Sequence, residues 1–577
     1  MTSTPASPPS AIDETVRTEI DHAIAALHAG SRVWTQFSLA QRATLLRRVR
    51  AAVGAVAREW AETAARSKGL HVGHPLVGEE WLSGPYAVLT GLDGYIESLE
   101  ALAAGRSPIE KLFVDDGPGG RTRVHTFPSH AVDHVLLSGF TGEVWLEPGV
   151  TPQDATATAG LAQRHPTEPG GVGLVLGAGN ITSIPVLDVL YELLAFSRVS
   201  ILKVNPTQDA LVPIFERALA ALIEPGFLRI VRGAGDVGAY LTAHEGVDHV
   251  HITGSAVTFD AIVWGQGEDA ASRRRADDPR LAHPITAELG GVSPIIVVPG
   301  EWSDADLRYQ AEHVVTMRLH NSGHNCIAGQ VVLLAASWPQ KDAFLQALRE
   351  AYGRAPARPV WYPNSAAKLS AAESDYPDAQ HCGDERLLIE AGDADAATAL
   401  ETTEYFSPVL GVVELPGEGR EFLRAAVAHA NDRLAGTLGA NVLVDPVTES
   451  TLGAAFDEEI AALRYGGIAI NAWTGVLFAT PALSWGAFPG HTVADVGSGL
   501  GVVHNTFLVD RIERSVLRGP FRPAPRSLGR SRFTILPKPP WFVTSRTGTA
   551  VSEGLTRYRA TGSPITLVTT LTKALGS

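Results

Sequence analysis

Apolar residues recur at helical spacing near the start of the chain. Between residues 14 and 62, positions such as Leu39, Ala43, Leu46 and Val49 are apolar, with polar and charged residues between them. A spacing of three to four residues places such side chains on one face of a helix. We therefore predict two amphipathic helices here, serving as scaffold.

The pattern becomes β-like from residue 121 to 147. The runs 123–127 and 144–146 are rich in β-branched and aromatic residues, which favour strands. A protruding sheet or hairpin is expected in this segment.

Beyond a Pro- and Gly-rich break at residues 165–171, short apolar runs alternate with helical patterns. The runs are 172–176, 199–203, 229–231 and 249–253. This alternation is typical of βαβ units around a parallel sheet. A second α/β block starts at Ala287; its expected elements are strands at 294–298 and 330–335 and a helix at 303–318. Two α/β lobes are thus indicated.

Composition and charge narrow the class of protein. A chain of 577 residues is too long for one core and predicts roughly two to four domains. No stretch reaches the roughly 20 apolar residues of a membrane span. Met1–Ser10 lacks the pattern of an export signal and is expected to be a disordered leader. The net charge of −15 argues against nucleic-acid binding. We therefore expect a cytoplasmic protein with no nucleic-acid partner and no membrane span.

The two cysteines, Cys326 and Cys382, fit a reducing cytosol and are too few for a Cys-rich zinc site. Cys326 lies in the Gly-containing segment His320–Gly329, downstream of Glu288 in Ala287–Gly291. A thiol beside glycines leaves room for a substrate, and a carboxylate on a separate turn can activate water. The two residues are therefore a candidate nucleophile and base. The alternative for a lone cysteine is a small buried apolar residue.

Two segments are candidates for holding a phosphate. Gly233–Gly238 has the spacing G-x-G-x-x-G, but a short strand precedes it and no acidic residue ends a strand about 20 residues later. We favour a helix-entry turn there. The other candidate is Ile252–Ser255 at a strand end, where N–H groups of the next helix can receive a phosphate.

Seven short blocks, in one order, resemble the aldehyde dehydrogenase superfamily. They are Gly177–Asn180, Ile201–Pro206, Ile252–Ser255, Glu288–Gly291, Asn321–Gly329, Glu404–Val409 and Ser484–Gly490. Each block alone is weak, but their shared order across residues 177–490 argues against chance.

The resemblance implies an α/β fold of the aldehyde dehydrogenase type, with two Rossmann-like parallel-sheet lobes and a β oligomerisation arm. It divides the chain into N-terminal helices of the cofactor-binding domain (1–120), oligomerisation strands (121–165), a cofactor-binding domain (166–286), a catalytic domain (287–478), and a return segment with a C-terminal extension and arm (479–577).

The same resemblance assigns catalytic roles. Cys326 becomes the nucleophile, Glu288 the general base for water, and the Asn180 side chain, with the Cys326 N–H, the donor to an oxyanion. The alternative for Asn180 is capping a helix that starts near Ile181. A protonated His324 that lowers the pKa of the thiol is a further hypothesis.

Four residues match positions that bind NAD or NADP in the family. Lys203 and Glu404 match residues that contact the two riboses, and Gly254 and Ser255 match the turn beside the pyrophosphate. The alternatives are a lysine that reaches solvent and a surface carboxylate. Pro206 stands where NAD-preferring members carry a glutamate, so NADP becomes acceptable.

Three further positions affect the interpretation. Phe259 stands where a helix glycine is usual, which questions the fit of the cofactor's pyrophosphate or adenine side. His249 and His251 share one face of a strand, a spacing that metal-binding histidines also have. We expect core or solvated histidines here and no metal.

The predicted activity is oxidation of an aldehyde to a carboxylic acid with hydride transfer to NAD(P)+. It proceeds through a thiohemiacetal and a thioester on Cys326, which water activated by Glu288 hydrolyses. The alternatives are a CoA-acylating enzyme and a catalytically silent scaffold. The aromatic residues expected to border the substrate tunnel are Trp473, Phe478 and Trp485, which mildly favour an apolar or aromatic aldehyde.

A homo-oligomer, dimer or tetramer, is also implied. Its candidate subunit-bridging strands are residues 121–147 and Arg532–Arg546. The tail after Val509 is rich in arginine, and these side chains are expected to pair with acidic groups of a neighbouring subunit.

Overall fold

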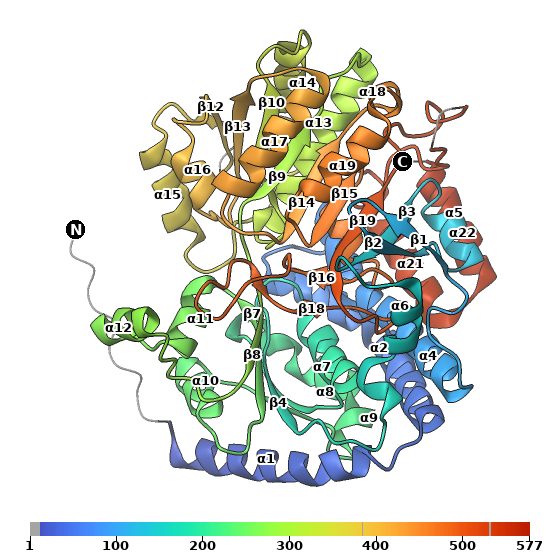
Figure 1. Cartoon of the computed structure of the whole chain (residues 1–577), viewed down its shortest axis with the longest axis vertical. Helices are drawn as coiled ribbons and strands as arrows, with labels where there is room; N and C mark the ends of the chain where they lie inside the picture. The colour runs from blue at the N-terminus through green and yellow to red at the C-terminus, as the bar shows by residue number, and fades with distance from the viewer. Residues whose placement is uncertain (1–11, 384, 530–531, 577) are drawn as a thin grey trace.

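The computed structural model describes residues 12–383, 385–529 and 532–576. The expected leader Met1–Ser10 and Arg530 of the basic tail therefore lie outside the described residues. Figure 1 shows two sheets, one in each half of the molecule. Helix α1 runs along the bottom of this view, and the C-terminal helices lie at its right side.

The two predicted N-terminal helices are confirmed as α1 (Glu14–Trp34) and α2 (Leu39–Ser67). Asp13 caps α1, and Ser38 forms a capping box with Gln41 at the start of α2. Such caps satisfy backbone N–H groups that lack a partner within the helix. After α2 come α3 (Gly78–Trp81), α4 (Ala87–Ala103) and α5 (Ala131–Leu136).

The first sheet has six strands in the order β17-β8-β7-β4-β5-β6. Its strands are β4 (Val172–Leu176), β5 (Val199–Lys203), β6 (Leu228–Val231), β7 (His249–Gly254), β8 (Ile285–Leu289) and β17 (Gly499–Leu500). Strands β4 to β8 pair in parallel and β17 pairs antiparallel to β8. The crossover helices include α7 (Ile184–Ala195), α10 (Gly235–Thr242) and α11 (Ala256–Val263). Every residue of α7 is buried, as a helix between a sheet and other helices requires.

The second sheet has eleven strands in the order β1-β2-β3-β19-β15-β14-β9-β10-β13-β12-β11, where β11 is Gln380–His381. Its parallel part comprises β9 (Ser293–Val297), β10 (Gly329–Ala335), β12 (Leu387–Gly392), β13 (Val409–Leu415), β14 (Gly439–Leu443), β15 (Gly467–Ile470) and β19 (Ile512–Arg518). Helix α13 (Asp304–Leu319) connects β9 to the loop before β10. The prediction of two parallel-sheet lobes is therefore confirmed. The finer division of the chain into five segments stays a prediction.

The β-like segment near residue 121 forms strands but does not protrude. Strands β1 (Phe113–Gly117), β2 (Arg121–Phe127) and β3 (Thr141–Leu146) pair antiparallel, and β3 pairs antiparallel with β19. Because β19 also pairs with β15, these strands extend the second sheet of their own chain. A protruding hairpin is thus a wrong expectation. The edge of the sheet that β19 offers is already filled within one chain.

The C-terminal extension is irregular where a strand was expected and becomes helical only after that stretch. None of the residues 532–546 is in a strand, and this stretch ends at α21 (Gly548–Thr561), which α22 (Pro564–Leu575) follows. Pro537, Pro539 and Pro540 remove backbone donors that a strand pairing would need.

Arginines of the tail form ion pairs with acidic groups of their own chain, whereas pairing with a neighbouring subunit was expected. Arg522 donates to Asp306 at 2.9 Å, and Arg526 also pairs with this carboxylate. Arg518 pairs with Glu449 at 3.3 Å and with Asp457 at 2.5 Å. The tail is therefore fixed to the second lobe by intrachain ion pairs.

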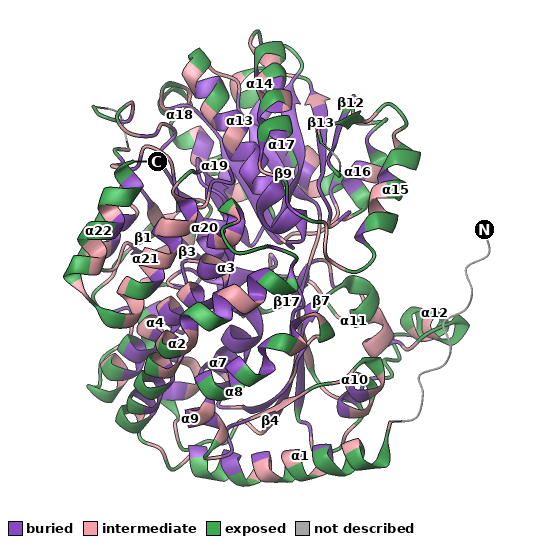
Figure 2. Cartoon of the chain, turned by 180° about the vertical axis from the view of Figure 1, so that it is seen from behind, coloured by how far each residue is buried: buried purple, intermediate pink, exposed green. Residues whose placement is uncertain are grey.

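Burial follows this layering. Figure 2 shows buried residues concentrated in the strands of both sheets, whereas α1 and α12 (Glu268–Ala276) carry exposed residues on their outer sides. Among the residues that the structure describes, no helix combines the length and apolarity needed to cross a bilayer.

Candidate active site

Cys326 and Glu288 lie in contact where the two lobes meet. Glu288 is on β8 of the first sheet, and Cys326 lies in the loop before β10 of the second sheet. The Cys326 Sγ donates a hydrogen bond to Glu288 Oε1 at 3.2 Å. The Trp485 indole N–H donates to the same oxygen at 3.1 Å. The structure thus brings together the predicted nucleophile and base.

Burial dominates the electrostatics of this pair. It raises the pKa of Glu288 to about 7, with a further rise from the charge of Asp188, although hydrogen bonds from Trp485 and Cys326 lower it. Burial and the neighbouring Glu288 charge raise the pKa of the Cys326 thiol well above its usual range. The thiol is therefore protonated here and acts as the donor to Glu288.

His324 does not activate the thiol. Burial lowers the pKa of His324 to about 3, so its ring is neutral, and its Nδ1 lies 2.7 Å from the Phe406 carbonyl oxygen. The hypothesis of a protonated histidine that lowers the thiol pKa is wrong because a buried ring without a carboxylate partner does not hold a charge.

Asn180 lies beside the nucleophile's loop. It follows β4, and its side-chain Nδ2 donates to the His324 carbonyl at 2.9 Å. Helix α7 begins later, at Ile184, and its N-cap residue is Ser183. The alternative in which Asn180 caps a helix is therefore wrong.

The residue before Asn180 is packed tightly. A side chain at Gly179 would come within 2.8 Å of Asn205 and Thr207 side-chain atoms. The Thr207 hydroxyl donates to the Gly179 carbonyl at 2.7 Å. These contacts fix the loop that presents Asn180.

The backbone before Cys326 adopts an uncommon conformation. Asn321 (φ 55°), Ser322 (φ 56°) and Gly323 (φ 74°) are consecutive left-handed residues. Non-glycine residues in this region cost about 1–3 kcal/mol each and persist only where their surroundings hold them. The Asn321 amide does so by donating to the Asn180 carbonyl at 3.2 Å and to the His324 carbonyl at 3.0 Å.

A buried charge cluster supports this loop, and sequence analysis missed it. Arg358 donates to Asn321 Oδ1 and to Glu80, each at 2.9 Å, and pairs with Glu79. Lys68 pairs with Glu80 at 2.9 Å. These residues come from α2, α3 and a loop near residue 358, so no local pattern links them. The only sequence signal was Glu79-Glu80 next to an apolar helix, which equally suits a solvated surface.

Glu404 faces the Gly-Gly turn after β8. A side chain at Gly290 would collide with its carboxylate, so this approach requires glycine. Burial raises the pKa of Glu404 to about 7, which Lys368 and the Gly291 N–H partly offset. Its Oε1 has no hydrogen-bond partner among the described residues. The alternative of a surface carboxylate is therefore wrong. The Glu404 carboxylate points toward the junction of the two lobes.

The residues predicted to bind a dinucleotide lie at one edge of the first sheet. Lys203 ends β5 and Gly254 ends β7, and the carboxyl ends of parallel strands share one edge. Ser255 caps α11 by accepting from the Thr258 N–H at 3.2 Å. The start of a helix beside an exposed glycine offers N–H groups to a phosphate. Together with the unpartnered oxygen of Glu404, this arrangement fits NAD(P).

The departures from the family pattern have local explanations. Phe259 is a fully buried residue of α11. Its ring therefore packs in the core and does not obstruct the turn at Gly254. Pro206 begins a 3₁₀ turn (Pro206–Leu211) and brings no carboxylate to that position. The segment Gly233–Gly238 is the entry to α10, as favoured from its context.

His249 and His251 are core residues. Their exposed fractions are 5% and 4%, and they lie 3.6 Å from Glu192 and Asp188 respectively. Across the described ranges, no group of three or more His, Cys, Asp or Glu side chains is placed to hold a metal ion.

An apolar cavity of about 140 Å³ opens beside Cys326. Trp473 and Phe478 line it as expected, whereas Trp485 does not and binds Glu288 instead. The site is thus a thiol and a carboxylate between two α/β lobes, next to an apolar chamber. These features define a two-lobed α/β protein with a candidate active-site cysteine.

Comparisons with known proteins give a family match over part of the chain. The model described as "Aldehyde dehydrogenase family" matches residues 146–360. Betaine aldehyde dehydrogenase 2 of Rhizobium meliloti (strain 1021) is 32% identical over 182 residues, which is 31% of this chain and 34% of that protein. The match thus spans about a third of the relative's length.

Solved structures extend the likeness to the fold. An NAD-dependent aldehyde dehydrogenase from Sinorhizobium meliloti has a TM-score of 0.58 and 20% identity, with 88% of each chain covered. An aldehyde dehydrogenase C mutant from Pseudomonas syringae, complexed with NAD+ and octanal, has a TM-score of 0.56 and 18% identity, covering 88% of this chain and 90% of that chain. An NADP-dependent enzyme of E. coli has the same TM-score and identity, covering 87% and 90%. The predicted resemblance is confirmed for residues 146–360 by the family match, and the solved structures show that the chain has the same fold.

Proposed function

We propose that this protein oxidises an aldehyde to a carboxylic acid with NAD+ or NADP+ as the oxidant. The observation that carries the proposal is the contact between Cys326 and Glu288 at 3.2 Å, beside an apolar cavity and between the two lobes. A thiol and a carboxylate in contact supply a nucleophile and the base that takes its proton.

Glu288 receives the thiol proton when the aldehyde is in place, and the Cys326 sulfur attacks the carbonyl carbon. Its raised pKa suits this step, because a base that titrates near pH 7 accepts a proton readily and releases it again. The oxyanion that forms needs donors. The second N–H of Asn180 and the Cys326 backbone N–H are the nearest candidates, since the first N–H of Asn180 is held by His324.

When bound, NAD(P)+ would supply the acceptor for the hydride of the former aldehyde carbon. Glu404, Lys203, Gly254 and Ser255 hold this cofactor in the proposal. The acyl group then remains on Cys326 as a thioester. Glu288 takes a proton from water, the water oxygen attacks the thioester, and the acid leaves with the sulfur restored.

Hydrolysis is favoured over transfer to CoA because Glu288 contacts the sulfur directly. A base in this position activates water against the acyl group before a large thiol enters. A silent scaffold is disfavoured because a buried carboxylate with a raised pKa costs stability, which a protein without catalysis has no reason to keep.

The test follows the absorbance of the reduced cofactor in a stopped-flow instrument, with an aldehyde panel, NAD+ or NADP+, and CoA present or absent. Cys326→Ala is expected to abolish reduction, and Cys382→Ala, which changes the other free thiol, is expected to retain it. Glu288→Gln is expected to keep a burst, because loss of the Glu288 charge lowers the thiol pKa and lets the thiolate form without this base, but to lose steady turnover. Reduction that persists in Cys326→Ala would falsify the proposal, and turnover that requires CoA would assign the acylating alternative.

We also propose a reducing compartment, the cytoplasm, because both cysteines are free. A homo-oligomer, dimer or tetramer, stays part of the proposal. Its support is the unpaired outer edge of β1, where Phe113 is exposed. Light scattering after size-exclusion chromatography measures the mass, and a Phe113→Lys variant that leaves the mass unchanged excludes this edge as the interface.

A further inference from the structure

We propose that α21 and α22 complete the substrate chamber and that the ion pair of Asp133 with Arg559 closes its far end, so that the chamber selects uncharged aldehydes with a ring-sized apolar body. This inference rests on the proposed function and specifies its substrate class.

The chamber connects the candidate nucleophile with the C-terminal extension. Cys326, Ile327 and Trp473 line it at the site, and Leu555 and Ala574 of the last two helices line it elsewhere. A cavity of about 140 Å³ is close to the roughly 150 Å³ of apolar cavities that accept benzene. A phenyl ring or an alkyl chain of similar volume therefore fits.

The extension forms a fixed wall of this chamber. Helix α21 packs against α2 and α3 at two glycines. A Cβ on Gly54 would lie 3.0 Å from the Ala560 Cβ, and one on Gly78 would lie 2.7 Å from the Thr549 Cα. Arg50 donates to the Arg559 carbonyl and holds the end of α21. Helices in such close contact do not swing away to admit a longer ligand.

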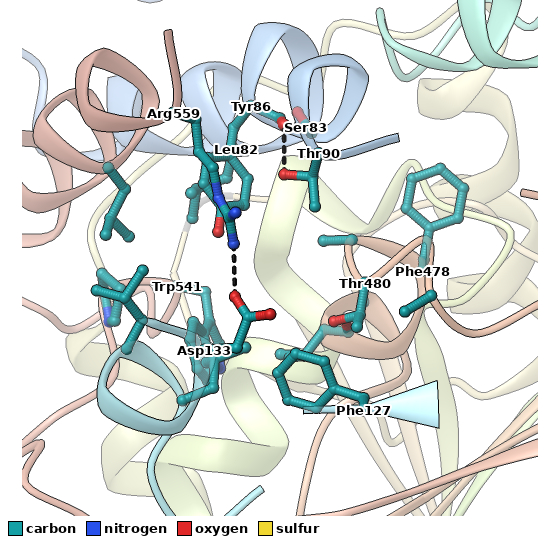
Figure 3. Close-up of a pocket in the computed structure, with 18 of the residues that line it drawn as sticks. Leu82, Ser83, Tyr86, Thr90, Phe127, Asp133, Phe478, Thr480, Trp541 and Arg559 are labelled. Carbon is teal, nitrogen blue, oxygen red and sulfur yellow. Dashed lines mark hydrogen bonds and ion pairs between the residues drawn. The ribbon is translucent and has the colours of Figure 1, made fainter. Parts of the chain in front are cut away.

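An ion pair crosses the chamber. Figure 3 shows Asp133 of α5 and Arg559 of α21 pointing toward each other, with Tyr86 and Trp541 nearby. Arg559 Nη2 donates to Asp133 Oδ1 at 2.6 Å, and the two side chains are only 14% and 7% exposed. A pair this buried neutralises both charges locally.

The other charged side chains of the lining are paired as well. Asp93 pairs with Arg50, and Glu97 lies 3.2 Å from His130. A substrate with a charged end would have to displace one of these partners. The buried Nε–H of Arg559 has no acceptor among the described residues. A single N–H suits an uncharged oxygen, whereas a carboxylate is best received by two parallel donors.

The experiment compares hexanal with 6-oxohexanoate, which replaces the terminal methyl by a carboxylate, and uses propanal as the short reference. For the wild type, kcat/KM for hexanal is expected to exceed that for 6-oxohexanoate by about tenfold or more. Asp133→Asn leaves the Arg559 charge uncompensated, so this ratio is expected to fall by about tenfold. A wild-type preference for 6-oxohexanoate, or an unchanged ratio in Asp133→Asn, overturns the assignment.

A second variant tests the wall. Leu555→Trp fills the chamber, so the ratio of kcat/KM for hexanal to that for propanal is expected to fall by about tenfold. Val568→Trp adds the same side chain at an exposed position of α22 and is expected to leave this ratio within about twofold of wild type. Equal ratios in both variants contradict the chamber.

Binding separates this inference from the proposed function. If no aldehyde is oxidised, the proposed function fails, and calorimetric titration with hexan-1-ol still tests the chamber. Saturable binding to wild type that Leu555→Trp removes and Val568→Trp keeps supports it. Absence of binding to wild type, or equal binding to both variants, overturns it. Thermal melting of each variant confirms that the compared proteins are folded.

Discussion

Cys326 Sγ donates a hydrogen bond to Glu288 Oε1 at 3.2 Å, so the candidate nucleophile and the candidate base share one proton. Each group also changes the acidity of the other. The Glu288 charge helps to raise the thiol pKa, and the thiol hydrogen bond lowers the pKa of Glu288, which burial has raised to about 7. The resting thiol is therefore protonated, and its proton lies in a hydrogen bond to this carboxylate.

Replacing Glu288 by Gln is expected to make Cys326 more reactive toward a small alkylating agent. The substitution removes the negative charge that opposes the thiolate, so the thiol pKa falls and more thiolate is present at pH 8. Steady turnover is expected to fall by about 10²–10⁴, because the base for water is lost. The rate of iodoacetamide labelling against pH measures the change.

The control for this labelling carries Cys382→Ala in both proteins, so that Cys326 is their sole thiol. If the pH midpoint of labelling is the same with Glu288 and with Gln, the two side chains are not electrostatically coupled.

Turnover is expected to increase with pH through a midpoint near 7. Glu288 must be ionised to accept a proton, and its pKa is about 7, so kcat falls as the pH drops below that value. The pKa of Glu404 is also about 7, and Glu404→Gln removes that second titration. A midpoint that persists in Glu404→Gln assigns it to Glu288, while its disappearance assigns it to Glu404. The measurement is kcat at saturating substrate from pH 5.5 to 9.

The same buried carboxylate is expected to reduce stability at alkaline pH. The pKa of Glu288 is higher in the folded state than the ordinary glutamate value of 4.5, so its contribution is fully present below about pH 4.5 and is lost as pH rises through about 7. The ionised group then costs roughly 3 kcal/mol. Glu288→Gln is therefore expected to melt about 2 °C higher than wild type at pH 8 and to show a smaller difference at pH 5.

Scanning calorimetry at the two pH values measures this difference. An equal shift at both pH values contradicts the explanation from charge and indicates a packing effect. Glu312→Gln, at a carboxylate paired on the surface side of α13 with Lys538, serves as a comparison in which no such gain at pH 8 is expected.

Arg358 is expected to be essential for the nucleophile's loop. It binds Asn321 and pairs with Glu79 and Glu80, so Arg358→Met leaves buried carboxylates with less compensation. Loss of one partner of a buried pair costs about 3–5 kcal/mol. Arg354→Ala removes a nearby exposed arginine and is expected to change stability by less than about 0.5 kcal/mol.

Urea unfolding measures both Arg358→Met and Arg354→Ala, and kcat is compared at temperatures where both variants are folded. Because Arg358 acts through Asn321, we expect a lower kcat together with a slower burst and an unchanged pH midpoint. A variant as stable and active as wild type shows that the left-handed residues before Cys326 do not depend on this cluster.

The parts that the sequence predicted well depend on local patterns. The strands β4 and β5 match the predicted runs because a parallel strand buried on both faces is a nearly continuous apolar segment. Glu288 and Cys326 were found because glycine-rich motifs mark turns with specific backbone needs. Their contact confirms the proximity that was expected, although the roles of both residues stay proposals.

The parts that were missed depend on pairings between distant segments. No feature of Thr141–Leu146 specifies that its partner is β19 of the same chain, since any free sheet edge accepts a strand. The sequence did not indicate that Arg358 and Glu79 are buried. A charged residue is buried only where a partner from a distant segment reaches it, and local sequence does not show that partner. The position of Trp485 in the sequence predicted a residue that borders the substrate tunnel. Its indole N–H instead donates a hydrogen bond to Glu288.

Lys203 is expected to affect NADP+ more than NAD+. It ends β5, and burial lowers its pKa, which the charges of Asp209 and Asp236 partly offset. Since Pro206 supplies no carboxylate, nothing at that position repels a 2′-phosphate, and Lys203 provides a cation at the end of β5. A charge-assisted hydrogen bond contributes about 1.5–3 kcal/mol, so Lys203→Ala is expected to raise KM for NADP+ by about tenfold or more and KM for NAD+ by less.

Initial rates with each cofactor measure the two KM values. Lys341→Ala serves as the control, because its ammonium pairs with Glu414 in the other lobe, and it is expected to change neither KM. If Lys203→Ala raises KM for both cofactors equally, Lys203 does not contact the 2′-phosphate. It then contacts a part that NAD+ and NADP+ share.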